Sequence, residues 1–162
     1  MEENMADNNG TTIIVMSGDM DKVMAAFNIA IGAASMGKET NMFFTFWGLK
    51  AIQKGNFTGK SFFGRMMGIM NRGGINRIGP SQFNFWGLGR WMFKQMMKNH
   101  HITPLEELRK TAMDLGVKLM PCQMSMDVME IKAEDLIPGI EESCGVATML
   151  ERADRSRQTL FI

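Results

Sequence analysis

The chain has 162 residues, of which 45 % are hydrophobic and 22 % charged, and its net charge is +1. These values are ordinary for one soluble globular domain that buries its own core. Its two cysteines, Cys122 and Cys144, form neither a disulfide framework nor a zinc-binding pattern, so we expect a reducing, cytoplasmic setting and no metal. Residues 1–10 are acidic and amide-rich rather than apolar, which predicts a frayed tail and not a signal peptide.

Charge is distributed unevenly along the chain. No Asp or Glu occurs between Thr40 and Leu105, whereas nine Lys and Arg residues do. The flanking segments carry the other nine basic residues and all 17 acidic ones. A basic middle between acidic flanks says little about the fold, but it predicts contact with a partner or with further copies of the chain.

The first part of the chain begins with a strand pattern followed by a helix pattern. Residues 11–17 are apolar and β-branched, as in a central strand, and Ser17, Gly18 and Asp19 form the turn into the next element. A helix is predicted over residues 22–36 because apolar residues recur on one face at steps of three and four, namely Met24, Phe27, Ile31 and Ala34.

A second strand over residues 39–46 and a short helix over residues 49–52 complete the pattern of a βαβ unit, which is typical of a parallel sheet. Neither GxGxxG nor GxxxxGK[ST] follows the first strand. The sequence therefore does not predict a dinucleotide fold, and we expect no cofactor.

Residues 55–101 interrupt this alternation and are rich in Met, Gly and aromatic residues. Residues 88–98 have the pattern of an amphipathic helix with Arg90, Lys94 and Lys98 on one stripe, and charges interrupt every apolar run before the ~20 residues of a membrane span. Such a segment fills a core, forms an oligomer interface or lies on a membrane surface, and we favour the interface. It contains no recognised RNA- or DNA-binding motif, so no nucleic-acid partner is expected.

The rest of the chain returns to the α/β pattern. Its expected elements are a helix over 105–115, a strand over 117–120, a strand over 140–143, a helix over 146–153 and a strand over 158–162. Counted with the first two, these make five strands with helices between most of them. We therefore expect one α/β domain over residues 1–162 with a mainly parallel sheet and an inserted helical segment over residues 55–101.

Cys122 is the candidate catalytic residue. It follows the strand that Pro121 ends, and Ser125 or Asp127 is suited to cap a helical turn just after it. A thiol between a strand and a helix N-terminus is favoured as thiolate, and in an open parallel sheet this edge is where ligands bind. A free cysteine is also among the most often buried residues, so an inert Cys122 remains an equal alternative at this point.

Three stretches resemble the DsrE/DsrF-like family, in its branch of putative sulfurtransferase or peroxiredoxin-like proteins. They are TTIIVMSGDMDKVMAAFNIAIGAASMGKETNMFFTFWGLKAI, PCQMSMDVMEI and CGVATMLERADRSRQTLFI. The resemblance implies a flavodoxin-like three-layer α/β sandwich with a five-stranded sheet, and assembly into trimers or hexamers. It also implies a persulfide on Cys122, exchanged with TusA-like or rhodanese-like donor and acceptor proteins. Cys144 stands where relatives often have glycine and is a possible second thiol.

A flavodoxin-like strand order, 2-1-3-4-5, would place the first and third strands side by side. Ser17, Gly18 and Asp19 would then line one crevice with Cys122 and its neighbours Gln123 and Ser125. A Cys122–Cys144 disulfide requires Cα atoms within about 7 Å, which no sequence shows, and we expect none.

Two functions other than sulfur relay remain open. One is a small-ligand or nucleotide-binding module that uses the same crevice. The other is a non-catalytic oligomeric scaffold in which Cys122 is inert and the basic, Met-rich insertion is the interaction surface.

Overall fold

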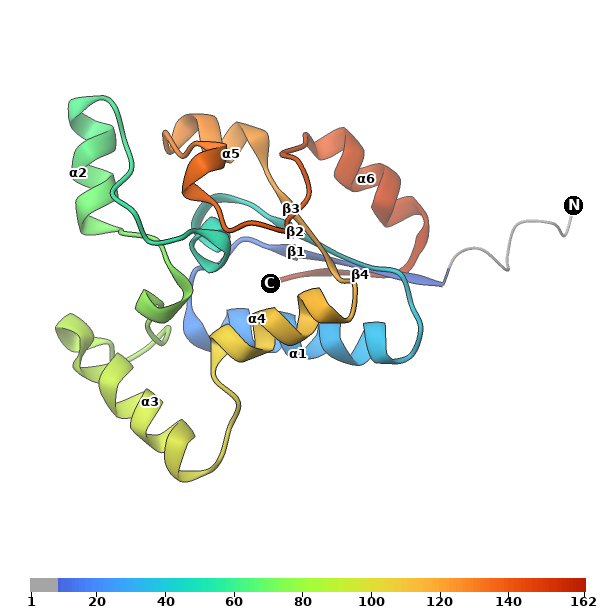
Figure 1. The fold of residues 1–162 in the computed structure, drawn as a ribbon, viewed down its shortest axis with the longest axis horizontal. Helices are drawn as coiled ribbons and strands as arrows, with labels where there is room; N and C mark the ends of the chain where they lie inside the picture. Colours follow the sequence, from blue (N-terminus) through green and yellow to red (C-terminus); the bar gives the residue numbers. More distant parts are fainter. Residues whose placement is uncertain (1–8) are drawn as a thin grey trace, which may run out of the picture.

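A computed structural model describes residues 9–162 (Figure 1), so the expected N-terminal tail lies almost wholly outside the described residues. The strands are β1 (Gly10–Val15), β2 (Thr40–Phe44), β3 (Lys118–Pro121) and β4 (Ser156–Phe161). They form one sheet in the order β3-β2-β1-β4, and every neighbouring pair is parallel. The parallel sheet expected from the sequence is confirmed.

Helices cover both faces of this sheet. On one face lie α1 (Met20–Ser35) and α4 (Leu105–Asp114), and on the other lie α5 (Gln123–Val128) and α6 (Val146–Asp154) (Figure 1). A strand covered on both faces needs apolar residues on both, which is why all five residues of β2 are buried. The main core lies between β1, β2, α1 and α4.

The expected fifth strand over residues 140–143 is wrong, although this segment does run along the outer edge of β3. Glu141 N–H donates to Leu119 O (2.9 Å) and Cys144 N–H donates to Pro121 O (3.0 Å). The two donors, Glu141 and Cys144, are three residues apart, whereas the two acceptors, Leu119 and Pro121, are two residues apart. The spacing therefore does not match, and a regular ladder does not form. Pro121 also has no N–H to return. Only an isolated bridge between Cys122 and Cys144 remains.

The expected strand order is also wrong. In the structure β2 lies between β1 and β3, and β4 pairs with the far edge of β1. This sequence of neighbours follows the 3-2-1-4 order of Rossmann-type sheets and not the 2-1-3 order of flavodoxin.

Helix α1 forms where the sequence predicts it, but its inner face is rotated from the expected one. The fully buried side chains of α1 are Met20, Val23, Ala26, Phe27, Ala30 and Ala33. Of the four residues expected to face the core only Phe27 is fully buried, whereas Met24, Ile31 and Ala34 pack at its margin. Both sets repeat with helical spacing, so periodicity gave the helix but not its orientation.

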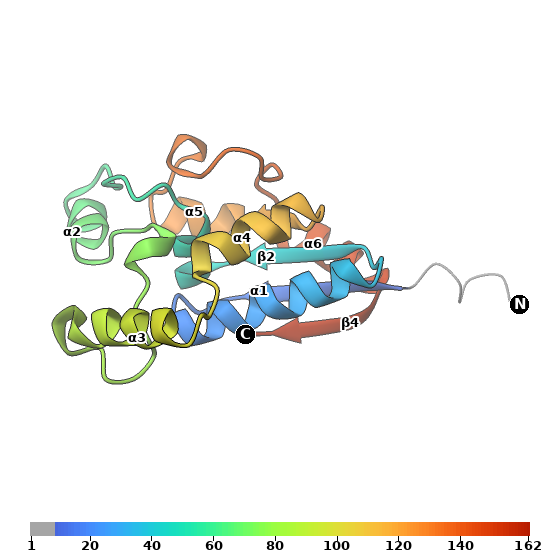
Figure 2. The ribbon, with the colours of Figure 1, turned by 60° about the horizontal axis from the view of Figure 1, so that its bottom comes forward.

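The insertion lies beyond the carboxyl ends of the strands, as the two views of the ribbon show (Figures 1 and 2). It follows a 3-10 turn, η1 (Phe46–Ile52), and contains α2 (Phe62–Met70), the short turns η2 (Ile75–Arg77) and η3 (Phe85–Gly87), and the amphipathic α3 (Leu88–Asn99). Another 3-10 turn, η4 (Ala133–Asp135), follows α5. No helix among residues 9–162 combines the length and the apolar character that crossing a bilayer requires.

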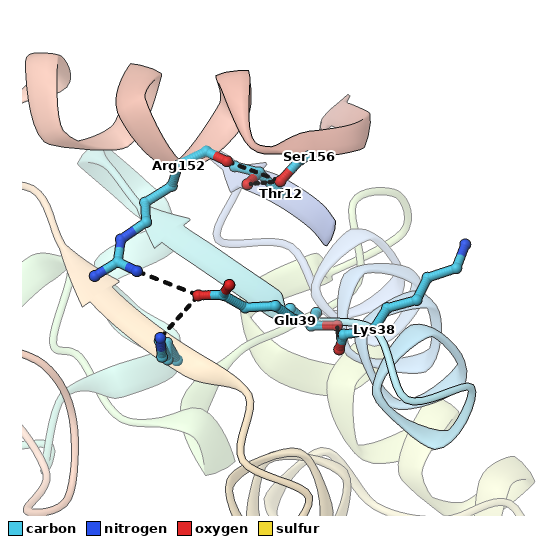
Figure 3. Close-up of polar contacts among 7 residues, drawn as sticks. Thr12, Lys38, Glu39, Arg152 and Ser156 are labelled. Atoms are coloured by element: carbon cyan, nitrogen blue, oxygen red, sulfur yellow. Dashed lines mark hydrogen bonds and ion pairs between the residues drawn. The ribbon is translucent and has the colours of Figure 1, made fainter. Parts of the chain in front are cut away.

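At the opposite, amino edge of the sheet, Glu39 links three elements (Figure 3). Its Oε1 atom accepts from Lys118 Nζ on β3 (2.8 Å) and from Arg152 Nη1 on α6 (3.2 Å). Nearby, the hydroxyls of Thr12 on β1 and Ser156 on β4 are hydrogen-bonded at 2.8 Å. These polar contacts link β2 with β3 and α6, and β1 with β4, at the amino edge of the sheet, away from Cys122.

Candidate functional site

Cys122 joins the end of β3 to the start of α5. Its N–H donates to Phe44 O (2.9 Å) at the end of β2, and its carbonyl accepts from Met126 N–H (3.0 Å) in the first turn of α5. Cys122 is itself the N-cap residue of this helix. The expected cap at Ser125 or Asp127 is therefore wrong, because the helix starts immediately after the cysteine and already contains both residues.

The side chain of Cys122 is 1 % exposed. It packs with Phe43, Met120 and Met149 in a small apolar cluster on the face of the sheet that α6 covers. In this arrangement a partner protein does not reach the thiol. The sequence left a buried Cys122 as one alternative, and the thiol is indeed buried. Any reaction of this thiol with another protein requires the residues that cover it to move.

Cys144 lies directly beside Cys122. The two residues are partners in a parallel backbone bridge, and Gln123 N–H donates to Cys144 O (3.0 Å). Neighbouring strands are about 4.8 Å apart, which lies within the Cα separations that disulfides span. Both cysteines are free thiols here. Partial burial raises the pKa of the Cys144 thiol, and the nearby Cys122 raises it further.

Gln123 and Ser125 have different surroundings. The side chain of Gln123 is at the surface, where its Oε1 atom accepts from Ser143 Oγ and its Nε2 atom donates to Asp127 Oδ1 (2.7 Å). It thus fastens the segment that carries Cys144. Ser125 is fully buried, and its hydroxyl is hydrogen-bonded to that of Thr45 at 2.8 Å, which ties α5 to the end of β2.

Ser17, Gly18 and Asp19 follow β1 and are separated from Cys122 by β2. Asp19 is the N-cap residue of α1 without a side-chain capping bond. Its Oδ2 atom instead accepts from Ser17 Oγ (2.9 Å) and Lys22 Nζ (2.9 Å). Gly18 and Asp19 line a cavity of about 420 Å³ whose other walls come from η1 and the insertion, and Cys122 is not among its lining residues.

Two further cavities, of about 500 and 460 Å³, lie around α3, α4 and η2, and neither is lined by Cys122. No three His, Cys, Asp or Glu side chains of residues 9–162 gather in a way that would hold a metal ion. The structure thus gives two separate places of chemical interest at the carboxyl edge: a buried pair of thiols beside β3 and a cavity beside β1.

Sequence reasoning missed the basic side chains that surround the cavity beside β1, which are Lys50, Arg72, Arg77 and Arg90. The available signal was the absence of acidic residues between Thr40 and Leu105. It indicated an unbalanced positive charge, but not that these four residues lie around one space.

Comparison with known proteins identifies the family. The model of the DsrE/DsrF/DrsH-like family matches residues 7–161. The chain belongs to this family. It is 40 % identical to the uncharacterized protein YrkE of Bacillus subtilis over 154 residues, which cover 94 % of this chain and 96 % of YrkE. It is 30 % identical to the sulfur carrier protein DsrE2 of Allochromatium vinosum over 154 residues, which cover 93 % and 96 %.

Two solved structures resemble this chain in fold. The ychN protein of E. coli superposes with a TM-score of 0.59 at 10 % identity, covering 95 % of this chain and 99 % of that protein. Protein MTH1491 of Methanobacterium thermoautotrophicum gives 0.55 at 9 % identity, covering 93 % and 99 %. At these identities the resemblance concerns the path of the chain and not its chemistry.

Proposed function

We propose that this protein is a sulfur-relay protein that carries sulfane sulfur as a persulfide on Cys122. The supporting observation is the junction of β3 and α5 at the carboxyl edge of the sheet, where Cys122 stands beside a second thiol. Family membership and a relative named as a sulfur carrier support the same chemistry. The proposed setting is the reducing cytoplasm, where free thiols persist.

Loading is a nucleophilic displacement at sulfur. The Cys122 thiolate attacks the outer sulfur of a donor persulfide, R–S–SH. A new S–S bond forms on Cys122, the donor S–S bond breaks, and the electron pair leaves with the donor thiolate. Transfer to an acceptor thiol repeats the step in the other direction, so no external oxidant or reductant is needed.

Because Cys122 is buried, loading requires a local opening. The segment that carries Cys144 is the element proposed to move. It makes no regular ladder with the sheet and is held to β3 and α5 by individual bonds, including Cys144 N–H to Pro121 O and Gln123 N–H to Cys144 O, both 3.0 Å. Segments with few such contacts open more readily than strands inside a sheet. A docking donor protein of the rhodanese or TusA-like kind would stabilise the open form.

Cys144 is proposed as a second thiol that limits the life of the persulfide. If its thiolate attacks the Cys122 sulfur, a Cys122–Cys144 bond forms and hydrosulfide leaves with the electron pair of the broken S–S bond. Burial raises the pKa of Cys144, which keeps it protonated at neutral pH and slows this loss. The persulfide is then available to an acceptor.

The first test is intact-protein mass spectrometry after incubation with glutathione persulfide, using wild type, Cys122→Ser and Cys144→Ser. We expect a reductant-sensitive gain of about 32 Da in wild type and Cys144→Ser, and none in Cys122→Ser. Circular dichroism checks that Cys122→Ser remains folded. Loading that survives Cys122→Ser would contradict the proposal.

A non-catalytic scaffold is the second candidate, and the 1 % exposure of Cys122 is the observation that favours it. Alkylation by iodoacetamide at neutral pH separates the two. Reaction of Cys122 in the folded protein shows that the site opens, whereas a Cys122 that remains unmodified until denaturant is added supports the scaffold.

We further propose that α2 and α3 form the surface through which the chain assembles, as trimers or hexamers. Both helices carry large apolar side chains that solvent reaches. On α2 these are Phe62, Phe63, Met66, Met67, Ile69 and Met70, and on α3 they are Leu88, Trp91, Met92 and Met96. Clusters of exposed apolar side chains commonly mark an interface. Peripheral contact with a membrane is the competing explanation of the same surface.

A further inference from the structure

Four basic residues line the cavity of about 420 Å³ beside the end of β1, and two of them, Arg72 and Arg77, also line the neighbouring cavity of about 460 Å³. Lys50 comes from η1, Arg72 and Arg77 from the segment after α2, and Arg90 from the first turn of α3. They come from three separate parts of the chain, so the cavity is a product of the tertiary fold and not of one basic run. It lies at the carboxyl edge of the sheet, the edge at which open α/β sheets bind ligands.

The acidic side chains that line this cavity do not neutralise its basic ones. Among the described residues 9–162, Asp19 is the only acidic one that lines the cavity, and its carboxylate already accepts from Lys22 Nζ (2.9 Å) and Ser17 Oγ (2.9 Å). Among the ion pairs of residues 9–162, none involves Lys50 or any of the three arginines. Four cations against one engaged carboxylate leave an excess of about three charges.

Two of the arginines are held in place by the backbone. Arg72 Nε donates to Gly55 O (2.6 Å), and its guanidinium lies 4.1 Å from the centre of the Phe57 ring. Arg90 Nη1 donates to Arg77 O (2.9 Å). A guanidinium has five N–H donors, so each of these contacts fixes a side chain while leaving most of its donors for another acceptor.

Lys50 adds a second kind of support. It is partly buried, and burial lowers the pKa of its ammonium group, while Asp19 opposes the shift. Removing an ammonium group from water is unfavourable unless an anion lies nearby. A bound anion would supply that partner.

The loop that carries Gly79 and Pro80 forms one wall of the cavity and is tied to α1. Met20 N–H donates to Gly79 O (2.8 Å), and Asp21 accepts from both the N–H and the hydroxyl of Ser81, each at 2.8 Å. The N–H of Met20, the first residue of α1, is therefore already hydrogen-bonded within the protein. The inferred anion site therefore rests on the basic side chains and does not use this amide.

We propose that this cavity binds a multiply charged oxyanion group of the phosphate or sulfate type through Lys50, Arg72, Arg77 and Arg90. Planar guanidinium groups bind such tetrahedral anions with two parallel hydrogen bonds, and the lysine adds a point charge. A volume of about 420 Å³ is in the range of small-ligand sites and leaves room for a molecule that carries such a group. Its source is a soluble organic phosphate or the headgroup of an anionic lipid.

Isothermal titration calorimetry with pyrophosphate and with ADP tests the soluble source. The variants are Lys50→Met and Arg77→Gln, with Arg65→Gln as matched control. Arg65 is an exposed arginine on α2 in the same acid-free segment, outside the lining of the cavity. We expect binding that weakens by about tenfold or more in Lys50→Met and Arg77→Gln, and by less than about twofold in Arg65→Gln.

Flotation with phosphatidylglycerol vesicles, with phosphatidylcholine vesicles as reference, tests the lipid source. A lipid headgroup is indicated if only anionic vesicles bind, and if Lys50→Met and Arg77→Gln abolish flotation while Arg65→Gln retains it. Equal losses in all three variants would show attraction by the overall charge and overturn the proposal. So would folded wild-type protein, verified by circular dichroism, that binds no probe in either assay. The inference is independent of the sulfur relay, since Cys122→Ser should bind the anion as wild type does.

Discussion

Cys122 and Cys144 form a bridge pair at the outer edge of β3. The backbone of Cys144 is hydrogen-bonded to the two residues that flank Cys122, Pro121 and Gln123, at 3.0 Å each. Parallel partners place their side chains on the same face of a sheet, and both residues accordingly meet the apolar cluster under α6. The sequence led us to expect no disulfide between them. The structure brings their backbones close enough for one, which makes the pair a defined subject for experiment.

Mild oxidation with diamide is expected to form an intramolecular Cys122–Cys144 bond. The bridge pairing keeps the two backbones about 4.8 Å apart, so little movement of the chain is required. Mass spectrometry under non-reducing conditions should show a loss of about 2 Da that tris(carboxyethyl)phosphine reverses. Cys144→Ser serves as control and should keep its mass. Covalent dimers in place of the intramolecular bond would contradict the expected proximity of the two thiols.

Sulfide release from protein loaded on Cys122 is expected to be slow at pH 7 and to accelerate as the pH rises. The reason is the raised pKa of Cys144, which keeps its thiol protonated beyond the ordinary cysteine value of about 8.5. Below that pKa the thiolate fraction, and with it the release rate, increases about tenfold per pH unit. Methylene-blue assay of sulfide between pH 7 and 9.5 measures this.

The Cys144→Ser variant provides the control for this pH profile. It cannot form the internal disulfide, so its release should lose the steep rise with pH. An unchanged profile in Cys144→Ser would assign the release to solvent or reagent and remove Cys144 from the mechanism.

Polar substitution on α2 is expected to reduce assembly without unfolding the chain. Phe62 and Met70 are 78 % and 81 % exposed, so Phe62→Ser with Met70→Ser should change the free energy of unfolding of the isolated chain by less than about 0.5 kcal/mol. Light scattering after size exclusion should show a smaller species than wild type. Met36→Ser is the matched control, since Met36 is 72 % exposed at the C-terminal end of α1. An unchanged mass, with lost binding to vesicles, would instead assign α2 to a membrane surface.

Glu39 is expected to make a small contribution to stability that disappears in acid. The ammonium group of Lys118 holds the pKa of the Glu39 carboxyl below its usual value, and Arg152 contributes less. A carboxyl with a lowered pKa in the folded state stabilises the protein above its unfolded pKa, and this stabilisation is lost as the pH falls through the folded pKa.

The measurement is urea unfolding of wild type and Glu39→Gln. Because all three side chains are partly exposed, the difference at pH 7 should be at most about 1 kcal/mol, and it should shrink as the pH falls below the ordinary glutamate pKa of about 4.3 (Figure 3). A difference that persists in acid would show that Glu39 acts through packing and not through its charge.

The sequence by itself determined the elements that local pattern controls. The strands near residues 13, 42, 118 and 160, the helices α1, α3 and α4, and the position of Cys122 between a strand and a helix all follow from features within a few residues. Apolar periodicity and the position of proline and glycine are readable without knowing the fold, because they act on neighbouring residues.

Tertiary structure alone decided the features that depend on distant residues. Strand β2 separates Ser17–Asp19 from Cys122, because strand order is set by packing across the whole sheet. The segment over 140–143 runs beside β3 without becoming a strand, because its hydrogen bonds to β3 are unequally spaced and Pro121 has no N–H to return. The burial of Cys122 under α6 and the convergence of Lys50, Arg72, Arg77 and Arg90 likewise join segments far apart in the chain. These contacts form only when the chain is folded, and no local pattern encodes them.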